Sequence, residues 1–274
     1  MKRVFSFIKK NPSFTVFLIL ALCIVAVAVL APLIATHDPY EAVLANAVQA
    51  PSSEHLFGTD KLGRDLFSRV IYGTRTSLTA ALCLVCIIMV LGTALGIVAG
   101  YFGGAVDAVI MRVADMMVSF PGMVLAIAIA GILGASITNA VIAIAAVSWT
   151  KYARLSRSLV LKIRNRDYVA AAQVTGSKTG YILYRYMLPN ALPTIVITGA
   201  TDIGSMMLEI AGLSFLGFGA QSPTAEWGLM LNEGRAYMTA APWLMIFPGL
   251  AIFITVVVFN LLGDSLRDVL DPKS

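Results

Sequence analysis

The sequence predicts an all-α, polytopic membrane protein with six transmembrane helices and both termini on the cytoplasmic side. Hydrophobic residues make up 58% of the 274 residues and charged residues only 13%, and the mean hydropathy is +0.84. A soluble domain carries roughly 25% charged residues and cannot bury so much apolar surface, whereas a bilayer can. The apolar residues also gather in runs close to the roughly 17–25 residues that cross a bilayer as a helix.

Six such runs follow one another along the chain. They are approximately Phe14–Ala35, Ser77–Gly100, Met117–Leu133, Ile137–Tyr152, Ala191–Leu216 and Trp243–Gly263. The first exceeds the apolar region of roughly 7–15 residues found in secretory signals, so we expect an uncleaved span. The second carries Gly92, Gly96 and Gly100, a ladder of small residues that allows close contact with a neighbouring helix. Pro121 is expected to kink the third.

The distribution of basic residues predicts the orientation. With the N-terminus inside, 15 of the 20 Lys and Arg residues lie in segments on the cytoplasmic side. The other five are Lys61, Arg64, Arg69, Arg75 and Arg235. This excess agrees with the positive-inside rule, and an even number of spans then places the C-terminus inside as well.

The polar segments between the runs suggest how the chain is organised. Residues 1–76 form an N-terminal span with an outside loop that holds both histidines, His37 and His55. Residues 77–274 form the core transmembrane domain, with a large inside loop at 151–190 and a second outside loop at 217–242.

Several function classes lack their signatures in this sequence. No run of basic and aromatic residues suggests nucleic acid as a partner. The P-loop pattern is missing, and Gly176–Thr179 imitates only its end, so we expect no ATP hydrolysis by this chain. Cys83 and Cys86 are one helical turn apart but have no further ligands nearby, and we interpret them as packing residues. We therefore expect no catalytic residue, cofactor or metal in this chain.

The inside loop has a helix–turn–helix pattern. Its first part, 168–175, is rich in alanine and favours a helix. Gly176 permits a turn that other residues resist, and Thr179–Met187 is expected to form a second short helix closed by Leu188 and Pro189. The expected result is a rigid projection on the cytoplasmic face; an ordinary helical surface loop is the alternative.

This loop resembles the E-A-A-x-x-x-G-x9-I-x-L-P loop of ABC-importer permeases. The resemblance implies that a loop at about 167–190 docks into a separate ATPase subunit. The residues that match the pattern are Ala171, Ala172, Gly176, Leu188 and Pro189. Two positions differ, since Ala170 stands where the family has an acid and Tyr186 where it has isoleucine.

Further motifs make the resemblance more specific. The stretches 55–60 and 63–65, 213–217, and 260–268 with Asp271 and Pro272 are similar to the C-type permeases of the dipeptide, oligopeptide and nickel importers. The resemblance implies a homologous B-type permease, two ATPase subunits that bind ATP, and an extracytoplasmic substrate-binding protein. It also implies the cytoplasmic membrane as the location, and a pathway that ATP switches between outward and inward access.

The cargo and the path are predicted from finer details. The runs 202–208 and 223–228 look closest to nickel-import permeases, so we predict nickel, free or chelated; import of dipeptides, oligopeptides or other metal chelates is the alternative. Asp202 and Glu209 lie seven residues apart on one face of the fifth span, as expected beside a translocation path or in a packing contact.

An ion-coupled secondary transporter is the rival class, but it commonly shows inverted repeats, and we find no internal repeat.

Asp60, Arg64 and Asp65 are expected either to contact a partner protein or to form a solvated, self-capped loop.

Overall fold

The computed structural model describes residues 11–270, and within that range the regular secondary structure is helical, with one isolated bridge between Thr59 and Asp65 in the loop before α3. Its long helices are α2 (Pro12–Ile34), α3 (Leu66–Phe102), α6 (Ile137–Arg164), α9 (Leu188–Phe215) and α11 (Trp243–Leu270). The shorter ones are α4 (Gly104–Val118), α5 (Gly122–Leu133), α7 (Asp167–Val174), α8 (Thr179–Ile182) and α10 (Trp227–Gly234).

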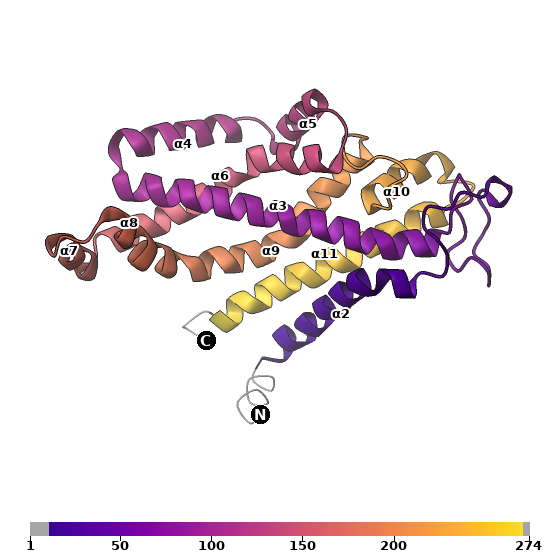
Figure 1. Cartoon of the computed structure of the whole chain (residues 1–274), viewed down its shortest axis with the longest axis horizontal. Helices are drawn as coiled ribbons and strands as arrows, with labels where there is room; N and C mark the ends of the chain where they lie inside the picture. The colour runs from indigo at the N-terminus through magenta and orange to yellow at the C-terminus, as the bar shows by residue number, and fades with distance from the viewer. Residues whose placement is uncertain (1–10, 271–274) are drawn as a thin grey trace.

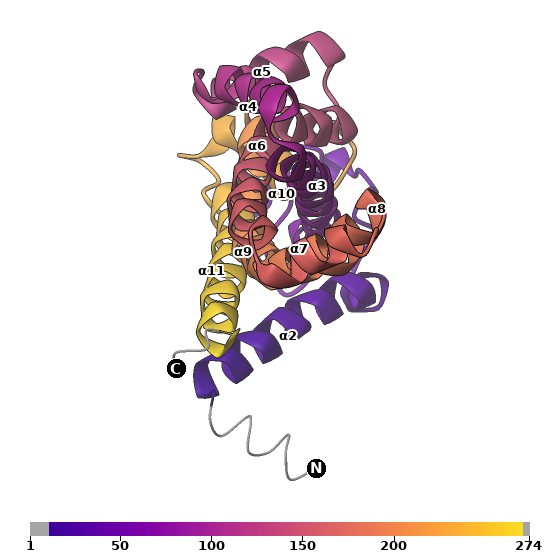
Figure 2. The same ribbon diagram turned by 90° about the vertical axis from the view of Figure 1, so that its left-hand side faces the viewer.

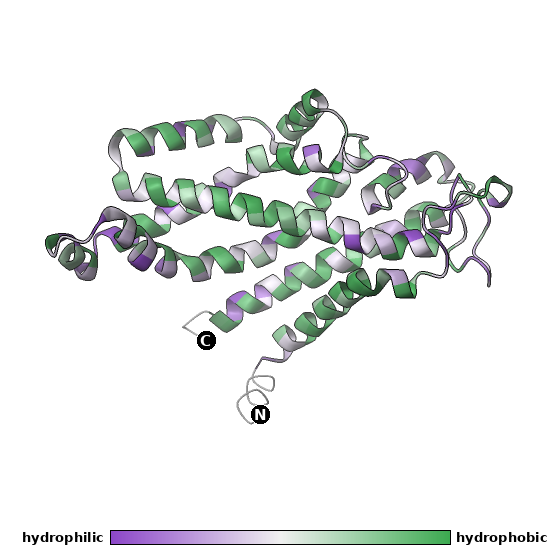
Figure 3. Ribbon diagram, in the orientation of Figure 1, coloured by the Kyte–Doolittle hydropathy of each residue, from purple (hydrophilic) through white to green (hydrophobic). Residues whose placement is uncertain are grey.

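The long helices run roughly lengthwise through the molecule (Figure 1). The core lies mainly where α3, α6 and α9 meet, with Leu84, Ile144 and Ile195 almost completely buried. α2 lies on one side of these helices, and α4 with α5 lies on the opposite side (Figures 1 and 2). Long apolar stretches colour α2, α5 and much of α3 in Figure 3.

The glycine ladder holds α3 against α6, which confirms that this span is buried against a neighbour. A Cβ on Gly92 or Gly96 would meet the backbone of α6 at Trp149 and Ala153, and a Cβ on Gly100 would lie 2.9 Å from Cβ of Val160. The absence of a Cβ at these three glycines therefore lets the two backbones approach closely along about two helical turns.

Four helices within residues 11–270 are long and apolar enough to cross a membrane: α2, α3, the helix that contains α9, and α11. The bent pair α4–α5 makes five if it counts as one span. The expected third span, Met117–Leu133, is not one helix, because α4 ends at Val118 and α5 leaves it at 92°. Pro121 lies at this break, where a residue without an N–H interrupts helical bonding.

Two predicted boundaries are wrong. α6 continues past Tyr152 to Arg164, so the inside loop begins later than residue 151. The domain division at residue 76 stays a prediction, and that residue lies within α3. The second loop helix is not closed by Leu188 and Pro189 either, because α8 continues through a π-helical turn, Leu183–Met187, directly into α9. The helix continues through Pro189 because proline is tolerated in the first turn of a helix, where Pro189 lies in α9.

Candidate functional site

Asp202 and Glu209 both face a cavity between three long helices. The cavity has a volume of about 290 Å³ and is lined by Ile88 of α3, by Lys151 of α6 and by Ser205 of α9, among others. The two carboxylates are seven residues apart, close to two helical turns, so one face of α9 presents both. The structure thus brings the two predicted path residues to one hollow.

Asp202 is bound by two neighbours from α6. Lys151 Nζ donates to Oδ1 at 2.6 Å, and the hydroxyl of Tyr152 donates to Oδ2 at 2.8 Å. The side chain of Asp202 is 5% exposed, whereas that of Lys151 is 57% exposed. A buried carboxylate is costly unless it is paired and hydrogen-bonded, and these two bonds meet that need. Sequence reasoning missed this role of Lys151 because it assigned the residue to a loop.

Glu209 is the less constrained carboxylate. It is half-buried, and no hydrogen bond or ion pair of its side chain occurs with the rest of residues 11–270. Met206 lines the same cavity, while Met207 is buried in the core, as expected for packing methionines. The hollow therefore holds one ion pair, Lys151–Asp202, and one carboxylate, that of Glu209, outside the pair.

The predicted loop 167–190 forms a compact projection, which we call the knob, made of α7, the turn at Gly176, α8 and the π-helical turn. It lies at the end of the molecule where α6 ends and α9 begins (Figure 1). A separate apolar cluster holds it against the bundle, with Val169, Ile182 and Met187 packed on Ile97 of α3 and Val160 of α6. The knob is therefore joined to the helices beneath it by a core of its own.

The turn of the knob requires a left-handed residue. Gly176 has a φ of +80°, and its N–H donates to the carbonyl oxygen of Gln173 at 3.0 Å. The next N–H, of Ser177, donates to the carbonyl oxygen of Ala172 at 3.0 Å. These bonds close the C-terminal end of α7, and glycine is the residue that adopts this φ without strain.

The five predicted docking residues divide by exposure. Ala171, Gly176 and Pro189 are exposed, Leu188 is half-buried and Ala172 is buried inside the knob. Ala172 therefore supports the shape of the knob from within.

The exposed apolar surface of the knob comes from residues that the motif does not contain. Val174 is 89% exposed and Tyr184 is 73% exposed, with Tyr168 and Tyr181 beside them at 43% and 53%. Large apolar residues in a polar loop were the available signal for this surface, because an exposed apolar patch usually marks a contact site.

Buried charges hold the loop that precedes α3. Arg64 pairs with Asp60 at 2.6 Å and with Glu233 at 2.8 Å, and Arg69 lies 3.4 Å from the same Asp60 carboxylate. Asp65 caps α3 by accepting from the N–H of Ser68 at 2.8 Å. Asp60, Arg64 and Asp65 are all buried, so they form neither a solvated loop nor an exposed contact surface. Arg64 joins this loop to α10 through Glu233.

Glu226 anchors the second outside loop. It is fully buried and caps α10, its carboxylate accepting from the N–H of Gly228 at 2.9 Å and of Leu229 at 2.8 Å. Burial raises the pKa of the Glu226 carboxyl, and the two backbone hydrogen bonds oppose that rise. The expected open loop at 217–242 is thus partly helical and packed into the molecule.

The described part of the chain is thus a bundle of long apolar helices with a knob at one end and a polar hollow between α3, α6 and α9. Residues 92–274 match the family described as binding-protein-dependent transport system inner membrane component. Residues 1–51 match the N-terminal TM domain of oligopeptide transport permease C. The chain belongs to the binding-protein-dependent inner membrane component family, which confirms the resemblance seen in its motifs.

Relatives with named substrates are similar over most of the chain. The dipeptide transport system permease protein DppC of Alkalihalophilus pseudofirmus is 43% identical over 99% of this chain and 90% of that protein. The nickel transport system permease protein NikC of Escherichia coli is 43% identical over 92% of this chain and 93% of that protein. The glutathione transport system permease protein GsiD of Pectobacterium atrosepticum is 48% identical over 82% of this chain and 75% of that protein.

A solved structure has the same fold. One chain of an amino acid ABC transporter with histidines superposes with a TM-score of 0.56 at 18% identity, covering 74% of this chain and 95% of that one. The protein is therefore a multi-pass membrane permease subunit of an ABC importer. Its relatives divide among dipeptides, nickel and glutathione, so the prediction of nickel stays a prediction.

Proposed function

We propose that this chain is one of two permease subunits in the cytoplasmic membrane and that it moves a small, zwitterionic, peptide-like cargo inward. In this proposal six passes cross the membrane, with α4–α5 as a bent third pass and α6 as the fourth. Both termini then lie in the cytoplasm, at the same side as the knob. The basic residues Lys162, Arg164 and Arg166 near the knob support that orientation.

The observation that carries the class is the knob. Val174 and Tyr184 expose apolar surface at the end where α6 meets α9, while Val169 and Met187 attach the knob to the bundle. A partner that pushes on this surface would act on both helices together. We assign that partner as an ATPase subunit, with ATP bound there and not on this chain.

The charges of the hollow support the choice of cargo. Lys151 is paired with Asp202 but more than half exposed, so its ammonium group can also contact a carboxylate of the cargo, and Glu209 offers a carboxylate with no hydrogen bond or ion pair to the rest of residues 11–270. A zwitterionic peptide carries the complementary pair of charges. Asp202 is already neutralised by Lys151 and Tyr152, so it adds little attraction for a bare cation.

Nickel is the second candidate, and Glu209 is the observation that favours it. A lone acidic group lowers the cost of a positive charge in a low-dielectric path. A nickel chelate carried by a small peptide-like molecule would satisfy both groups. The relatives named for nickel and for dipeptides are equally identical to this chain.

Two experiments test the proposal. Co-purification of the detergent-solubilised chain should recover ATPase subunits, and uptake driven by an ion gradient without them would overturn the class. For the cargo, a deletion strain should lose dipeptide uptake and keep normal nickel accumulation. The opposite pattern would replace the peptide by nickel without changing the class.

A further inference from the structure

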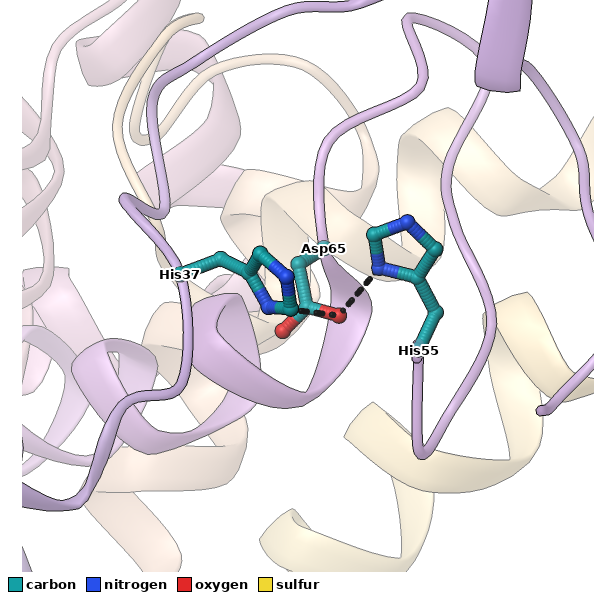
Figure 4. A group of neighbouring side chains, drawn as sticks. All are labelled: His37, His55 and Asp65. Carbon is teal, nitrogen blue, oxygen red and sulfur yellow. Dashed lines mark hydrogen bonds and ion pairs between the residues drawn. The ribbon is translucent and has the colours of Figure 1, made fainter. Parts of the chain in front are cut away.

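Both histidines of the chain meet one aspartate at the outside end of the bundle. His37 follows the end of α2, His55 lies in the first outside loop, and Asp65 caps α3 (Figure 4). His55 Nδ1 lies 2.9 Å from Asp65 Oδ1, and His37 Nδ1 lies 3.8 Å from the same oxygen. The two rings are 4.9 Å apart between centroids, and one ligand atom from each residue lies within 4.8 Å of the others.

These distances suit a metal ion. Bonds of about 2.0–2.2 Å to nitrogen and oxygen in a tetrahedral site place ligand atoms about 3.3 Å apart. The observed 2.9 Å and 3.8 Å fall on either side of that value. The three ligand atoms lie within 4.8 Å of one another, so one imidazole has to rotate toward the other for all three to reach a single ion.

The electrostatics of Asp65 also favour a cation. Its side chain is 1% exposed, and its ion pairs within residues 11–270 are with the two histidines and not with a Lys or Arg. A buried carboxylate is stabilised by a positive partner. A divalent cation between the three side chains would supply such a charge.

Neighbouring groups hold the ligands in place. Asp65 Oδ2 accepts from the N–H of Ser68 at 2.8 Å, which leaves Oδ1 facing the rings. The backbone N–H of His37 donates to Ser68 Oγ at 3.0 Å, so the same serine holds a second ligand residue. Such supporting contacts orient the ligands of metal sites.

The ring of His55 can adjust. Its Nε2 is buried and has no hydrogen-bond partner within the part of the chain that the structure describes. No hydrogen bond at that nitrogen therefore opposes a small rotation that turns Nδ1 from Asp65 towards a shared cation. His37 is 37% exposed, which leaves an approach from solvent.

We propose that His37, His55 and Asp65 bind one divalent transition-metal cation, with one nitrogen from each imidazole and one carboxylate oxygen. Imidazole nitrogen selects zinc, nickel, copper or iron, whereas calcium and magnesium prefer oxygen ligands throughout. The bound ion joins the end of α2 to the start of α3, and three protein ligands leave a coordination position open to water. The site does not depend on the identity of the cargo.

The sequence did not predict this site and led us to expect no metal. The three residues are separated along the chain, and no short ligand motif contains them. They meet only because the first outside loop folds back over the start of α3.

Cobalt(II) is the probe for the test, since its visible absorption reports coordination by imidazole. The full chain is purified in detergent with an affinity tag that contains no histidine. The chain has only two histidines, so an imidazole signal has a single source. We expect one cobalt per chain and competition by zinc or nickel.

Three variants decide the outcome. His37→Ala removes a partly exposed ligand, and Asp65→Asn removes the charge but keeps a side chain that caps helices well. Each should raise the dissociation constant at least about tenfold, since even loss of a supporting contact costs 10–100-fold. A variant with Cys23, Cys83 and Cys86 changed to Ala is the matched control and should bind as the wild type does.

Two results would overturn the site. One is the absence of saturable cobalt binding by the wild-type chain. The other is unchanged binding by His37→Ala and Asp65→Asn. Thermal unfolding with and without nickel checks that the variants fold: the wild type should be stabilised by nickel, and a folded His37→Ala chain should not.

Discussion

The turn of the knob can be tested by changing Gly176 to alanine. A Cβ at this position would meet nothing within 4 Å, so a side chain has room. The φ of +80° is the obstacle, because it places an ordinary residue in the left-handed region at a cost of about 1–2 kcal/mol. The need for glycine at this position therefore comes from the backbone conformation and not from a lack of space.

The size of the effect follows from that strain. A penalty of about 1–2 kcal/mol lowers the population of the native turn roughly 5–30-fold relative to alternatives of similar energy. If the ATPase recognises the native knob, Gly176→Ala should reduce stimulated ATP hydrolysis by up to that factor. Gly176→Leu should behave like Gly176→Ala, and Gly176→Asn should be milder because asparagine tolerates this conformation.

Gly180 provides the matched control in the same knob. It is also exposed with nothing within 4 Å of a Cβ, but it lies in α8 without a positive φ. Gly180→Ala should therefore leave hydrolysis unchanged, since alanine is favoured in helices. The assay is ATP hydrolysis by the complex reconstituted with its ATPase and binding protein. Equal activity of Gly176→Ala and Gly180→Ala at the wild-type level would refute the reasoning.

Three further outcomes are expected. Gly96→Leu should push α3 from α6, costing about 1–3 kcal/mol, and should lower the thermal stability of the purified chain, whereas Gly249→Ala, where a Cβ would lie 3.9 Å from its nearest neighbour, should have a smaller effect. Lys151→Met should destabilise more than Asp202→Ala, because it leaves the buried Asp202 carboxylate without a positive partner, whereas Asp202→Ala leaves a mostly solvated lysine and an unpaired Tyr152 hydroxyl at about 1–3 kcal/mol; equal losses in thermal unfolding would contradict this. For Glu226 the pKa in the folded state lies above its ordinary value of 4.5, so protonation of this carboxyl favours folding. The resulting contribution to stability is complete below pH 4.5. It is lost as the pH rises through the folded-state pKa. The melting temperature of the wild type should thus fall relative to that of Glu226→Gln as pH increases, and parallel pH profiles would contradict the assignment.

The sequence predicted the helical class because bilayer-length apolar runs are its strongest signal. It also predicted the close approach at Gly92 and Gly96, since small residues at this spacing have few other uses in a membrane helix. The turn at Gly176 followed from local backbone preference. These features depend on neighbours in sequence or on a single helix face, which is why they could be found.

The features that escaped prediction depend on distant pairs. Lys151 belongs to the polar hollow because α6 continues beyond its apolar run, and only the structure brings it to Asp202. The salt bridges of Arg64 likewise join a loop to Glu233, which is far away in the chain. A charged residue near the end of an apolar run therefore has two possible positions, loop or buried pair, and composition does not distinguish them.

The arrangement of α6 and α9 suggests how the knob communicates with the hollow. α6 enters the knob and α9 leaves it, and the two halves of the Lys151–Asp202 pair lie one on each helix. At 1.5 Å per residue, each partner lies roughly 20 Å along its helix from the knob. Helices transmit displacement with little compression, so a push on the knob moves both partners.

The energetic consequence depends on how the two helices move. If they move together, the 2.6 Å contact persists and the hollow shifts as a unit; if they slide past each other, the contact breaks. A broken contact leaves a buried carboxylate held by Tyr152 alone and exposes the ammonium group to cargo. The pair is therefore suited to act as a latch with two discrete states, which is the kind of element through which a distant site can bias a pathway.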